Sequence, residues 1–243
     1  MNKVALITGA NRGIGFETAK ALGALNINLI IGCRDIDKGE AAAKELQALG
    51  FMAEAIAYNA NDTNSADAVY QYIEKKYGEL DILINNAGMI AEELIGENSS
   101  STVSQSVLQN TFQVNLFSVV ALTQKLLPLI KRSDSGRIVN LSSVVGSLTL
   151  HNMENSPIDP AKAFAYNASK TALNAYTIHL AHALKDTKIK VNSAHPGWAK
   201  TDLGGPYAQM EVSDSYKTSL RLATLDSDGP SGGFFHESET LPW

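Results

Sequence analysis

The sequence predicts an α/β fold, a doubly wound parallel sheet of about seven strands with helices on both faces. Strand-like and helix-like segments alternate almost throughout the chain, which is the pattern of a parallel sheet with helical crossovers. A glycine-rich turn at residues 8–15 directly follows the first apolar run. The 243 residues, 44% of them hydrophobic, can bury one large core, and no linker rich in Pro, Gly or Ser divides them. We therefore expect a single domain that spans residues 1–243.

The N-terminal half is expected to alternate strands with helices. Residues 4–7 are an uninterrupted apolar run, which is typical of a strand buried on both faces. Apolar residues at helical spacing, such as Ala42 and Leu46, indicate the helices. The segments that follow are a helix from 16 to 22, a strand at 28–35, a helix at 37–49, a strand at 52–58, a helix at 64–77 and a strand at 80–84.

The C-terminal half continues the same alternation. Residues 103–132 are long enough for one or two helices, with Pro128 near their end. The segments that follow are a strand at 137–141, an alanine-rich helix at 162–184, a strand at 190–194, a helix near 209–224 and a short last strand at 233–236.

The glycine-rich and polar segments directly follow predicted strands. Because the carboxyl ends of parallel strands meet at one edge of the sheet, and ligands of such sheets bind there, these segments are expected to share one site. They are Gly9 to Gly15, Arg34, Asn86 to Gly88, Ser143 and Pro196 to Thr201.

The glycine turn is expected to bind a pyrophosphate. Gly9, Gly13 and Gly15 lie between a strand and a helix, with the spacing Gly-x-x-x-Gly-x-Gly. Glycines let the backbone approach a phosphate closely, and the start of a helix offers free N–H groups and a positive dipole end. The alternative is a tight turn that only packs the helix on the strand.

Two arginines favour a cofactor with a 2′-phosphate. Arg34 ends the second strand, where an acidic residue commonly holds the ribose of NAD and an arginine suits NADP. Arg12 lies inside the glycine turn, and guanidinium groups bind phosphate by charge and paired hydrogen bonds. Asp35 complicates this interpretation, and the alternative is that both arginines are solvated surface charges.

Acid–base chemistry is expected from Tyr166 and Lys170, which lie four residues apart on one helix face. An ammonium one turn away favours the phenolate, so it should ease proton transfer to a carbonyl oxygen or from an alcohol. An ordinary surface pair is the alternative. Ser143 is preferred to Ser142 as a second donor, because it lies nearer the strand's carboxyl edge. Asn115, a polar residue in an apolar helical run, either holds a water near Lys170 or is a structural amide.

Other features limit the function classes. The net charge of −5 and the absence of a long basic run argue against nucleic acid as a partner. No stretch of about eighteen uninterrupted apolar residues is present, and the chain enters a strand within three residues, so we expect no membrane span, no signal peptide and a cytoplasmic protein. Cys33 is the only cysteine, the histidines show no metal-ligand spacing, and no metal site is expected. His195 has no acidic neighbour in sequence and is interpreted as structural.

These residues resemble the short-chain dehydrogenase/reductase family over essentially the whole chain. The matching motifs are Thr8-Gly9-x-x-x-Gly13-Ile14-Gly15, Asn85-Asn86-Ala87-Gly88, Asn115, Ser143, Tyr166-x-x-x-Lys170 and Pro196-Gly197. The resemblance implies a Rossmann-type fold and hydride transfer, with Asn115, Ser143, Tyr166 and Lys170 as the catalytic set. The implied cofactor-binding residues are Gly9, Asn11, Arg12, Gly13, Ile14, Gly15, Arg34, Asn59, Ala60, Asn86, Ala87, Gly88, Tyr166, Lys170, Pro196, Gly197, Ala199 and Thr201.

Within the family the chain looks most like the NADPH-dependent carbonyl reductases. Asn59 stands where many members have aspartate, and an amide oxygen can accept the same hydrogen bond. Ser143 and Tyr166 are farther apart than in the simplest members, and the extra segment near 148–163 resembles the carbonyl reductase insertion. It should lie beside the substrate cleft, and it leaves open whether the protein is a homo-oligomer or a monomer.

The resemblance implies an NADPH-dependent reductase of aldehydes or ketones, or a dehydrogenase that oxidises the matching alcohols by the reverse hydride transfer. A small molecule is thus the expected partner. The alternatives are a non-catalytic NADP-binding redox sensor and a sugar-nucleotide epimerase, which usually needs a larger C-terminal part. The expected cleft walls are 89–100, 144–163 and 198–215. Candidate apolar lining residues are Met89, Met153, Phe164, Trp198, Leu203 and Tyr207, although core packing explains them equally well.

Overall fold

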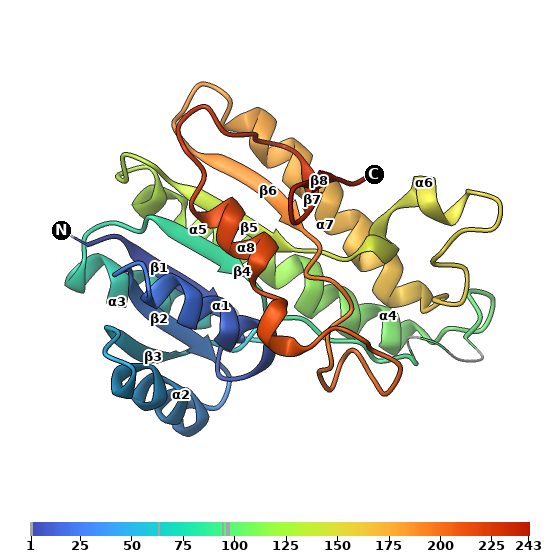
Figure 1. Ribbon diagram of the computed structural model, residues 1–243, viewed down its shortest axis with the longest axis horizontal. Helices are drawn as coiled ribbons and strands as arrows, with labels where there is room; N and C mark the ends of the chain where they lie inside the picture. Colours follow the sequence, from blue (N-terminus) through green and yellow to red (C-terminus); the bar gives the residue numbers. More distant parts are fainter. Residues whose placement is uncertain (1, 63, 94, 96–97) are drawn as a thin grey trace.

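The computed structural model describes residues 2–62, 64–93, 95 and 98–243 and has three layers, with one sheet between two layers of helices (Figure 1). The sheet has eight strands in the order β3-β2-β1-β4-β5-β6-β7-β8. Seven of them are parallel and β8 pairs antiparallel with β7. The strands are β1 Val4–Thr8, β2 Asn28–Cys33, β3 Ala53–Ala57, β4 Ile82–Asn85, β5 Arg137–Leu141, β6 Lys190–Ala194, β7 Phe234–His236 and β8 Glu239–Thr240. The predicted doubly wound fold is therefore confirmed, with a short hairpin strand added at its edge.

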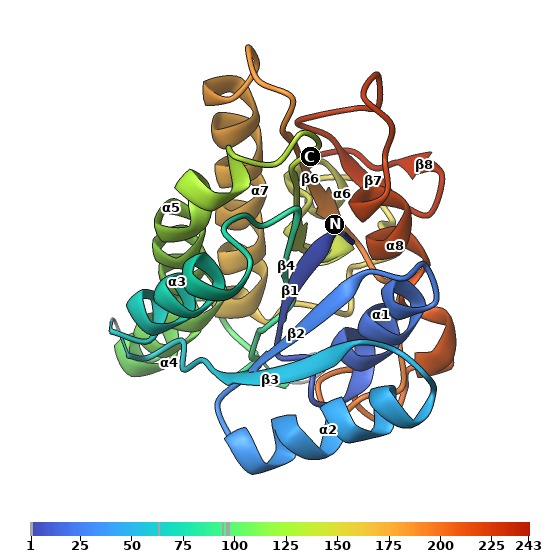
Figure 2. The ribbon, with the colours of Figure 1, turned by 90° about the vertical axis from the view of Figure 1, so that its left-hand side faces the viewer.

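Helices cover both faces of the sheet (Figure 2). They are α1 Gly13–Gly23, α2 Ile36–Ala48, α3 Ser65–Lys76, α4 Gln105–Phe112, α5 Ser118–Ile130, α6 Leu148–His151, α7 Phe164–Ala183 and α8 Lys217–Ala223. A π-helical turn, Gln113–Phe117, joins α4 to α5. One strand shows how the layers arise. In β1, Ala5 and Ile7 pack with α1, α2 and α8, whereas Val4 and Leu6 pack with α3, α5 and α7, because successive side chains of a strand point to opposite faces.

The predicted helix at 209–224 begins only at Lys217. The preceding residues bond instead to the segment that follows β6. The Met210 N–H donates to the Trp198 carbonyl over 3.1 Å, and the Lys200 N–H donates to the Met210 carbonyl over 2.9 Å. These two bonds form an isolated bridge between Ala199 and Met210, so the backbone at 210 is extended and not helical.

A chain of buried polar side chains lies between the sheet and its helices. The Asn85 amide donates to Asn140 over 2.9 Å and to Thr123 over 3.1 Å. Asn140 in turn donates to Thr177 over 2.9 Å, and Ser193 donates to the same hydroxyl oxygen over 2.8 Å. These five residues, which come from β4, α5, β5, α7 and β6, are each no more than 2% exposed. These direct side-chain hydrogen bonds offset most of the cost of burial, and among the described residues only the Asn85 Oδ1 of this hydrogen-bonded chain lacks a partner.

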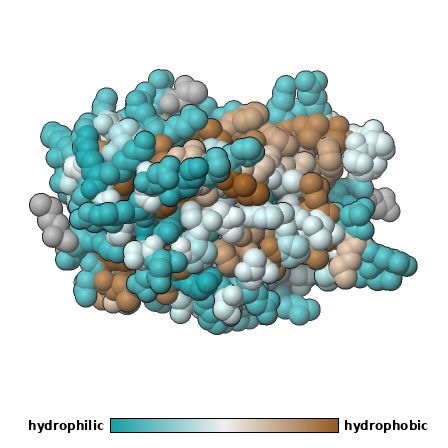
Figure 3. Space-filling model, turned by 90° about the horizontal axis from the view of Figure 1, so that it is seen from above, coloured by the Kyte–Doolittle hydropathy of each residue, from teal (hydrophilic) through white to brown (hydrophobic). Residues whose placement is uncertain are grey.

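The helical run from Gln105 to Ile130 is long and apolar enough, by length and composition, to cross a membrane. Such a test is also passed by core helices, and Leu122, Leu126 and Leu129 of this run are fully buried in the fold. Figure 3 shows one face on which hydrophilic residues are widespread, with apolar residues mainly in its upper half and a smaller apolar group at the lower left. The expectation that the protein does not enter a membrane stays a prediction.

Candidate active site

The carboxyl ends of β1, β2, β4, β5 and β6 open onto one cavity of about 1010 Å³. Every residue predicted to bind the cofactor lines it, as do Ser143, Tyr166 and Lys170 of the predicted catalytic set. The predicted cofactor-binding residues in this lining are Gly9, Asn11, Arg12, Gly13, Ile14, Gly15, Arg34, Asn59, Ala60, Asn86, Ala87, Gly88, Tyr166, Lys170, Pro196, Gly197, Ala199 and Thr201. The expectation that segments after the strands share one edge is confirmed. Asn115, the remaining member of the predicted catalytic set, is not among the lining residues.

The glycine turn has no room for side chains at its tightest point. Gly9 and Gly13 have φ values of +67° and +59°, which L-residues with side chains rarely adopt. A Cβ atom on Gly15 would lie 2.5 Å from the Asn86 amide nitrogen and 2.8 Å from Ala10 Cα. The first N–H groups of α1, which have no partners within the helix, therefore start directly at the cavity. This arrangement fits a bound phosphate group.

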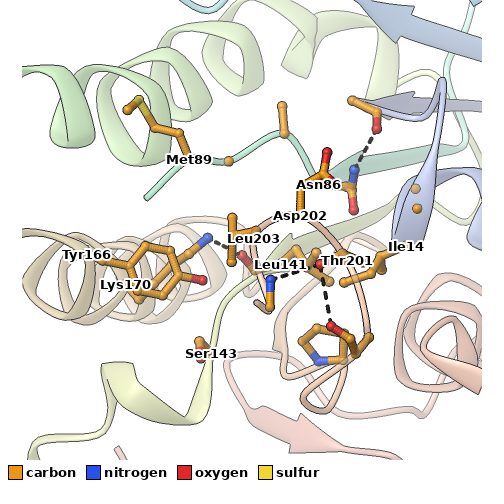
Figure 4. Close-up of a pocket in the computed structure, with 18 of the residues that line it drawn as sticks. Ile14, Asn86, Met89, Leu141, Ser143, Tyr166, Lys170, Thr201, Asp202 and Leu203 are labelled. Atoms are coloured by element: carbon orange, nitrogen blue, oxygen red, sulfur yellow. Dashed lines mark hydrogen bonds between the residues drawn. The ribbon is translucent and has the colours of Figure 1, made fainter. Parts of the chain in front are cut away.

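Asn86 holds the glycine turn from behind. Its side-chain amide donates to the Thr8 carbonyl over 2.7 Å and to the Gly9 carbonyl over 3.2 Å. The Thr8 hydroxyl oxygen accepts the N–H groups of Asn86 and Ala87, each over 3.0 Å. The two donors of the Asn86 amide are thus used inside the protein, and Asn86 shapes the turn in addition to lining the cavity (Figure 4).

The two arginines border the cavity with exposed side chains, and Asp35 turns away from it. Asp35 is the N-cap of α2, and its carboxylate accepts the Lys38 N–H over 3.3 Å. That hydrogen bond is the largest of the effects that lower the Asp35 pKa. The Arg12 guanidinium forms an ion pair with Asp202, which lies in the segment after β6. Asp202 was not predicted as a site residue, and nothing near it in sequence indicates this pairing.

Tyr166 and Lys170 lie side by side on α7 and are almost fully buried. The Lys170 Nζ donates to the Leu141 carbonyl over 2.7 Å and lies 5.6 Å from the centre of the Tyr166 ring. Burial raises the pKa of Tyr166 to about 12 and lowers the pKa of Lys170 to about 8. The net shift of the Tyr166 pKa is therefore opposite to the predicted direction, because the loss of solvation outweighs the effect expected of the lysine.

Ser143, and not Ser142, is the serine that acts on the Tyr166 phenol. Its side chain lowers the tyrosine pKa and so partly opposes the effect of burial. The Ser142 hydroxyl instead faces the Lys170 carbonyl at 3.5 Å, on the backbone of α7. The geometry therefore favours Ser143 as the partner of the phenol.

His195 holds the loop after β5. The Val144 N–H donates to His195 Nδ1 over 3.3 Å, and the rings of His195 and His236 are 5.0 Å apart. Burial, with a smaller effect from His236, lowers the pKa of His195 to about 3. A neutral ring that accepts a backbone N–H agrees with the structural interpretation of this histidine.

Asn115 is buried beside the cavity. Its amide exchanges two hydrogen bonds with the backbone of Met89, over 2.8 and 2.9 Å, and donates to Ser169 over 3.0 Å. These contacts fit the structural alternative weighed for Asn115. Its role in holding a water stays a prediction.

The far side of the cavity from the glycine turn has apolar walls. Three of the candidate lining residues, Met89, Trp198 and Leu203, do line it. Met153, Phe164 and Tyr207 are 53%, 42% and 66% exposed and lie outside the lining. The segment near 148–163 contributes Pro157, Ile158, Pro160 and Ala161. Of the expected wall 89–100, residues 94, 96 and 97 lie outside the described residues.

Glu92 is a site residue that sequence reasoning missed. Its carboxylate accepts the N–H groups of Ala165 and Tyr166 at the start of α7. The signal available in the sequence was indirect, since residue 163, which precedes the helix, is alanine and cannot cap it.

Within the described parts of the chain, no group of three or more His, Cys, Asp or Glu side chains could hold a metal ion.

Comparison with known proteins gives one family. Residues 3–212 match the family described as short chain dehydrogenase. Salutaridine reductase of Papaver bracteatum is 30% identical over 299 residues, covering 98% of this chain and 95% of that protein. Carbonyl reductase (NADPH) 1 of Bos taurus is 30% identical over 280 residues, covering 100% of this chain and 99% of that protein.

Solved structures agree with this result. The crystal structure of NADPH-bound carbonyl reductase from chicken fatty liver is 28% identical, with a TM-score of 0.84, and the match covers 100% of this chain and 99% of that one. The carbonyl reductase Sniffer of D. melanogaster is 28% identical, with a TM-score of 0.82 and complete coverage of both chains. Together with the glycine turn and the Tyr166–Lys170 pair, these matches show that the chain belongs to the short-chain dehydrogenase/reductase family, in its carbonyl reductase-like branch.

Proposed function

We propose that this protein is an NADPH-dependent reductase of aldehydes or ketones with apolar substituents. The observation that carries the proposal is that Ser143 lines the same cavity as the buried Tyr166 and Lys170, a cavity that the glycine turn also lines. A dinucleotide in this cavity would extend from Arg34, after β2, past the start of α1 to Lys170.

The residues present fit NADPH. The Gly9–Gly15 turn can receive the pyrophosphate, and Arg12 and Arg34 border the place where a 2′-phosphate would lie. Relatives named for NADPH, and a carbonyl reductase solved with NADPH bound, support the same cofactor. Asp35 is the residue that complicated the choice of NADP over NAD, because a carboxylate there could hold a free ribose hydroxyl. Its side chain instead caps α2.

Bound NADPH supplies a hydride to the carbonyl carbon, and the products are the alcohol and NADP⁺. Tyr166 gives its hydroxyl proton to the carbonyl oxygen, and Ser143 holds that oxygen by a second hydrogen bond. A phenol with a raised pKa is fully protonated at neutral pH, which is the form that a proton donor needs. Lys170 would hold the ribose. Its ammonium group would also stabilise the negative charge that develops on the phenol oxygen as the proton leaves.

The substrate side of the cavity is suited to apolar groups. Val145 and Ile158 pack with Tyr166 in one buried cluster, and Ile90 and Leu203 pack against that cluster. A carbonyl compound would place its substituents on these side chains and its oxygen between Ser143 and Tyr166.

We place the enzyme in the cytoplasm. Its single cysteine, Cys33, cannot form an intrachain disulfide, so the fold does not need an oxidising compartment.

The test is NADPH consumption by the purified protein against aldehydes, ketones and quinones, with NADH in parallel. Tyr166→Phe should lower kcat by about 10²- to 10⁴-fold, which is the usual contribution of a positioned acid. It should leave NADPH binding largely intact, because the glycine turn is unaltered. Tyr176→Phe, on the same helix but outside the cavity lining, is the matched control and should keep full turnover.

Two results would count against the proposal. Full turnover by Tyr166→Phe would remove the phenol from the chemistry. Binding of NADPH with no turnover of any carbonyl by the unaltered protein would favour the alternative, a non-catalytic sensor. Because Tyr166, Lys170 and Ser143 all line the cavity, that alternative is the weaker one.

A further inference from the structure

The helix that carries Tyr166 and Lys170 has no cap from its own sequence. Ala163 occupies the N-cap position of α7 and offers no side-chain acceptor for the first N–H groups. Glu92, 71 positions earlier than Ala163, takes over this role. Its Oε1 accepts the Ala165 N–H over 3.2 Å, and its Oε2 accepts the Tyr166 N–H over 3.0 Å. A carboxylate at a helix start makes charge-assisted hydrogen bonds and complements the helix dipole.

Glu92 belongs to a segment that also forms the cavity wall. Met89 lines the cavity, and both polar atoms of its backbone are bonded to the Asn115 side chain. Ile90 packs against the apolar cluster that contains Tyr166. The segment is therefore fixed at two points, by Asn115 at Met89 and by the start of α7 at Glu92. Its position and that of the Tyr166 backbone are set together.

We propose that Glu92 is a positioning residue that holds the Tyr166 phenol and the 89–92 wall in register with Ser143. It lies outside the cavity lining and acts through the backbone N–H of Tyr166 itself. As the assignment of Tyr166 as the acid is part of the proposed function, the proposal rests on that function.

The location of the cap in α7 explains why the effect should be local. Tyr166 is the third residue of a helix of twenty, so its backbone lies in the turn that the cap secures. The rest of α7 is buried through residues such as Leu173 and Thr177 and does not depend on Glu92. Loss of the carboxylate should loosen the first turn while the helix persists. A displacement of about 1 Å in a reacting group can lower a rate by about 10²-fold.

The kinetic test compares Glu92→Ala and Glu92→Gln with Glu93→Ala, whose side chain is exposed beside it. Glu92→Ala should lower kcat by about tenfold or more, while KM for NADPH stays within about twofold, because the cofactor is held mainly by the glycine turn. Glu92→Gln keeps one acceptor and should retain more of kcat. Glu93→Ala should behave as the unaltered protein. A kcat for Glu92→Ala within about twofold of normal would overturn the proposal.

A second readout is independent of turnover. The ring signal of ¹³C-labelled Tyr166, assigned with Tyr166→Phe, should shift or broaden in Glu92→Ala and not in Glu93→Ala. An unchanged ring signal would overturn the proposal even if the unaltered protein reduced no carbonyl, in which case the proposed function would have failed separately. Should Glu92→Ala not fold, Glu92→Gln decides by the same two measurements.

Discussion

The neutral ring of His195 predicts a loss of stability in mild acid that one substitution should remove. The folded pKa of this histidine is about 3, below its ordinary value of 6.5, because of desolvation on burial and, to a smaller extent, the neighbouring His236. The unfolded chain thus binds a proton as the pH falls through 6.5, and the folded chain does not until about pH 3. The contribution of His195 to the free energy of unfolding is fully present above pH 6.5 and is lost progressively as the pH falls towards 3.

The size of the effect follows from the two pKa values. At 1.36 kcal/mol per unit, lowering the pH from 7 to 5 should reduce the free energy of unfolding by about 2 kcal/mol through His195 alone. His195→Asn keeps an acceptor for the Val144 N–H but cannot be protonated in this range. Its loss of stability between the two pH values should be smaller than that of the unaltered protein by this amount.

The assay is urea unfolding of both proteins at pH 7 and pH 5, with His179→Asn as the control on the exposed face of α7. Carboxylates also contribute to acid unfolding, so the difference between the proteins is the quantity to compare. An equal loss in His195→Asn and the unaltered protein would refute the reasoning, because it would mean that His195 is already solvated, or already protonated, in the folded state.

Two further predictions concern the cofactor end of the cavity. Arg34→Asp should weaken NADPH binding by about tenfold or more, because a hydrogen bond to a charged group contributes about 1.5–3 kcal/mol. NADH binding should weaken less. Fluorescence titration with both nucleotides measures the two affinities. Equal losses would place Arg34 away from the 2′-phosphate. Gly15→Ala should cost about 1–3 kcal/mol of stability in urea unfolding and abolish tight NADPH binding, because its Cβ would lie 2.8 Å from the backbone at Ala10. A stable Gly15→Ala protein with normal affinity would show that the turn can open at little cost.

The sheet was predictable because its strands are buried on both faces. Continuous apolar runs such as 4–7 and 82–84 identify such strands locally, and their order then gives the shared edge. The segment at 209–216 was not predictable in the same way. Its conformation depends on hydrogen bonds with Trp198 and Lys200, which periodicity within the segment does not report.

The site was predictable where residue type alone carries the chemistry. Glycines at a strand–helix turn and the Tyr166–Lys170 spacing belong to that class. The partners Asp202 and Glu92 could not be found, because each meets its partner only through the fold. The direction of the Tyr166 pKa was missed for a related reason. Spacing shows that a lysine is near, but not how completely water is excluded from both groups.

The buried hydrogen-bonded side chains from Asn85 to Ser193 help to fix the register of the strands they join. The Thr177 hydroxyl accepts from Asn140 and Ser193 and donates to the Leu173 carbonyl, so it is saturated in one arrangement. Apolar contacts tolerate a sliding strand, whereas these side chains would lose several directional bonds at once if β5 or β6 slipped by a residue. A misaligned collapse is thereby disfavoured during folding. The strand ends that present Asn86, Ser143 and Pro196 to the cavity therefore finish level with one another.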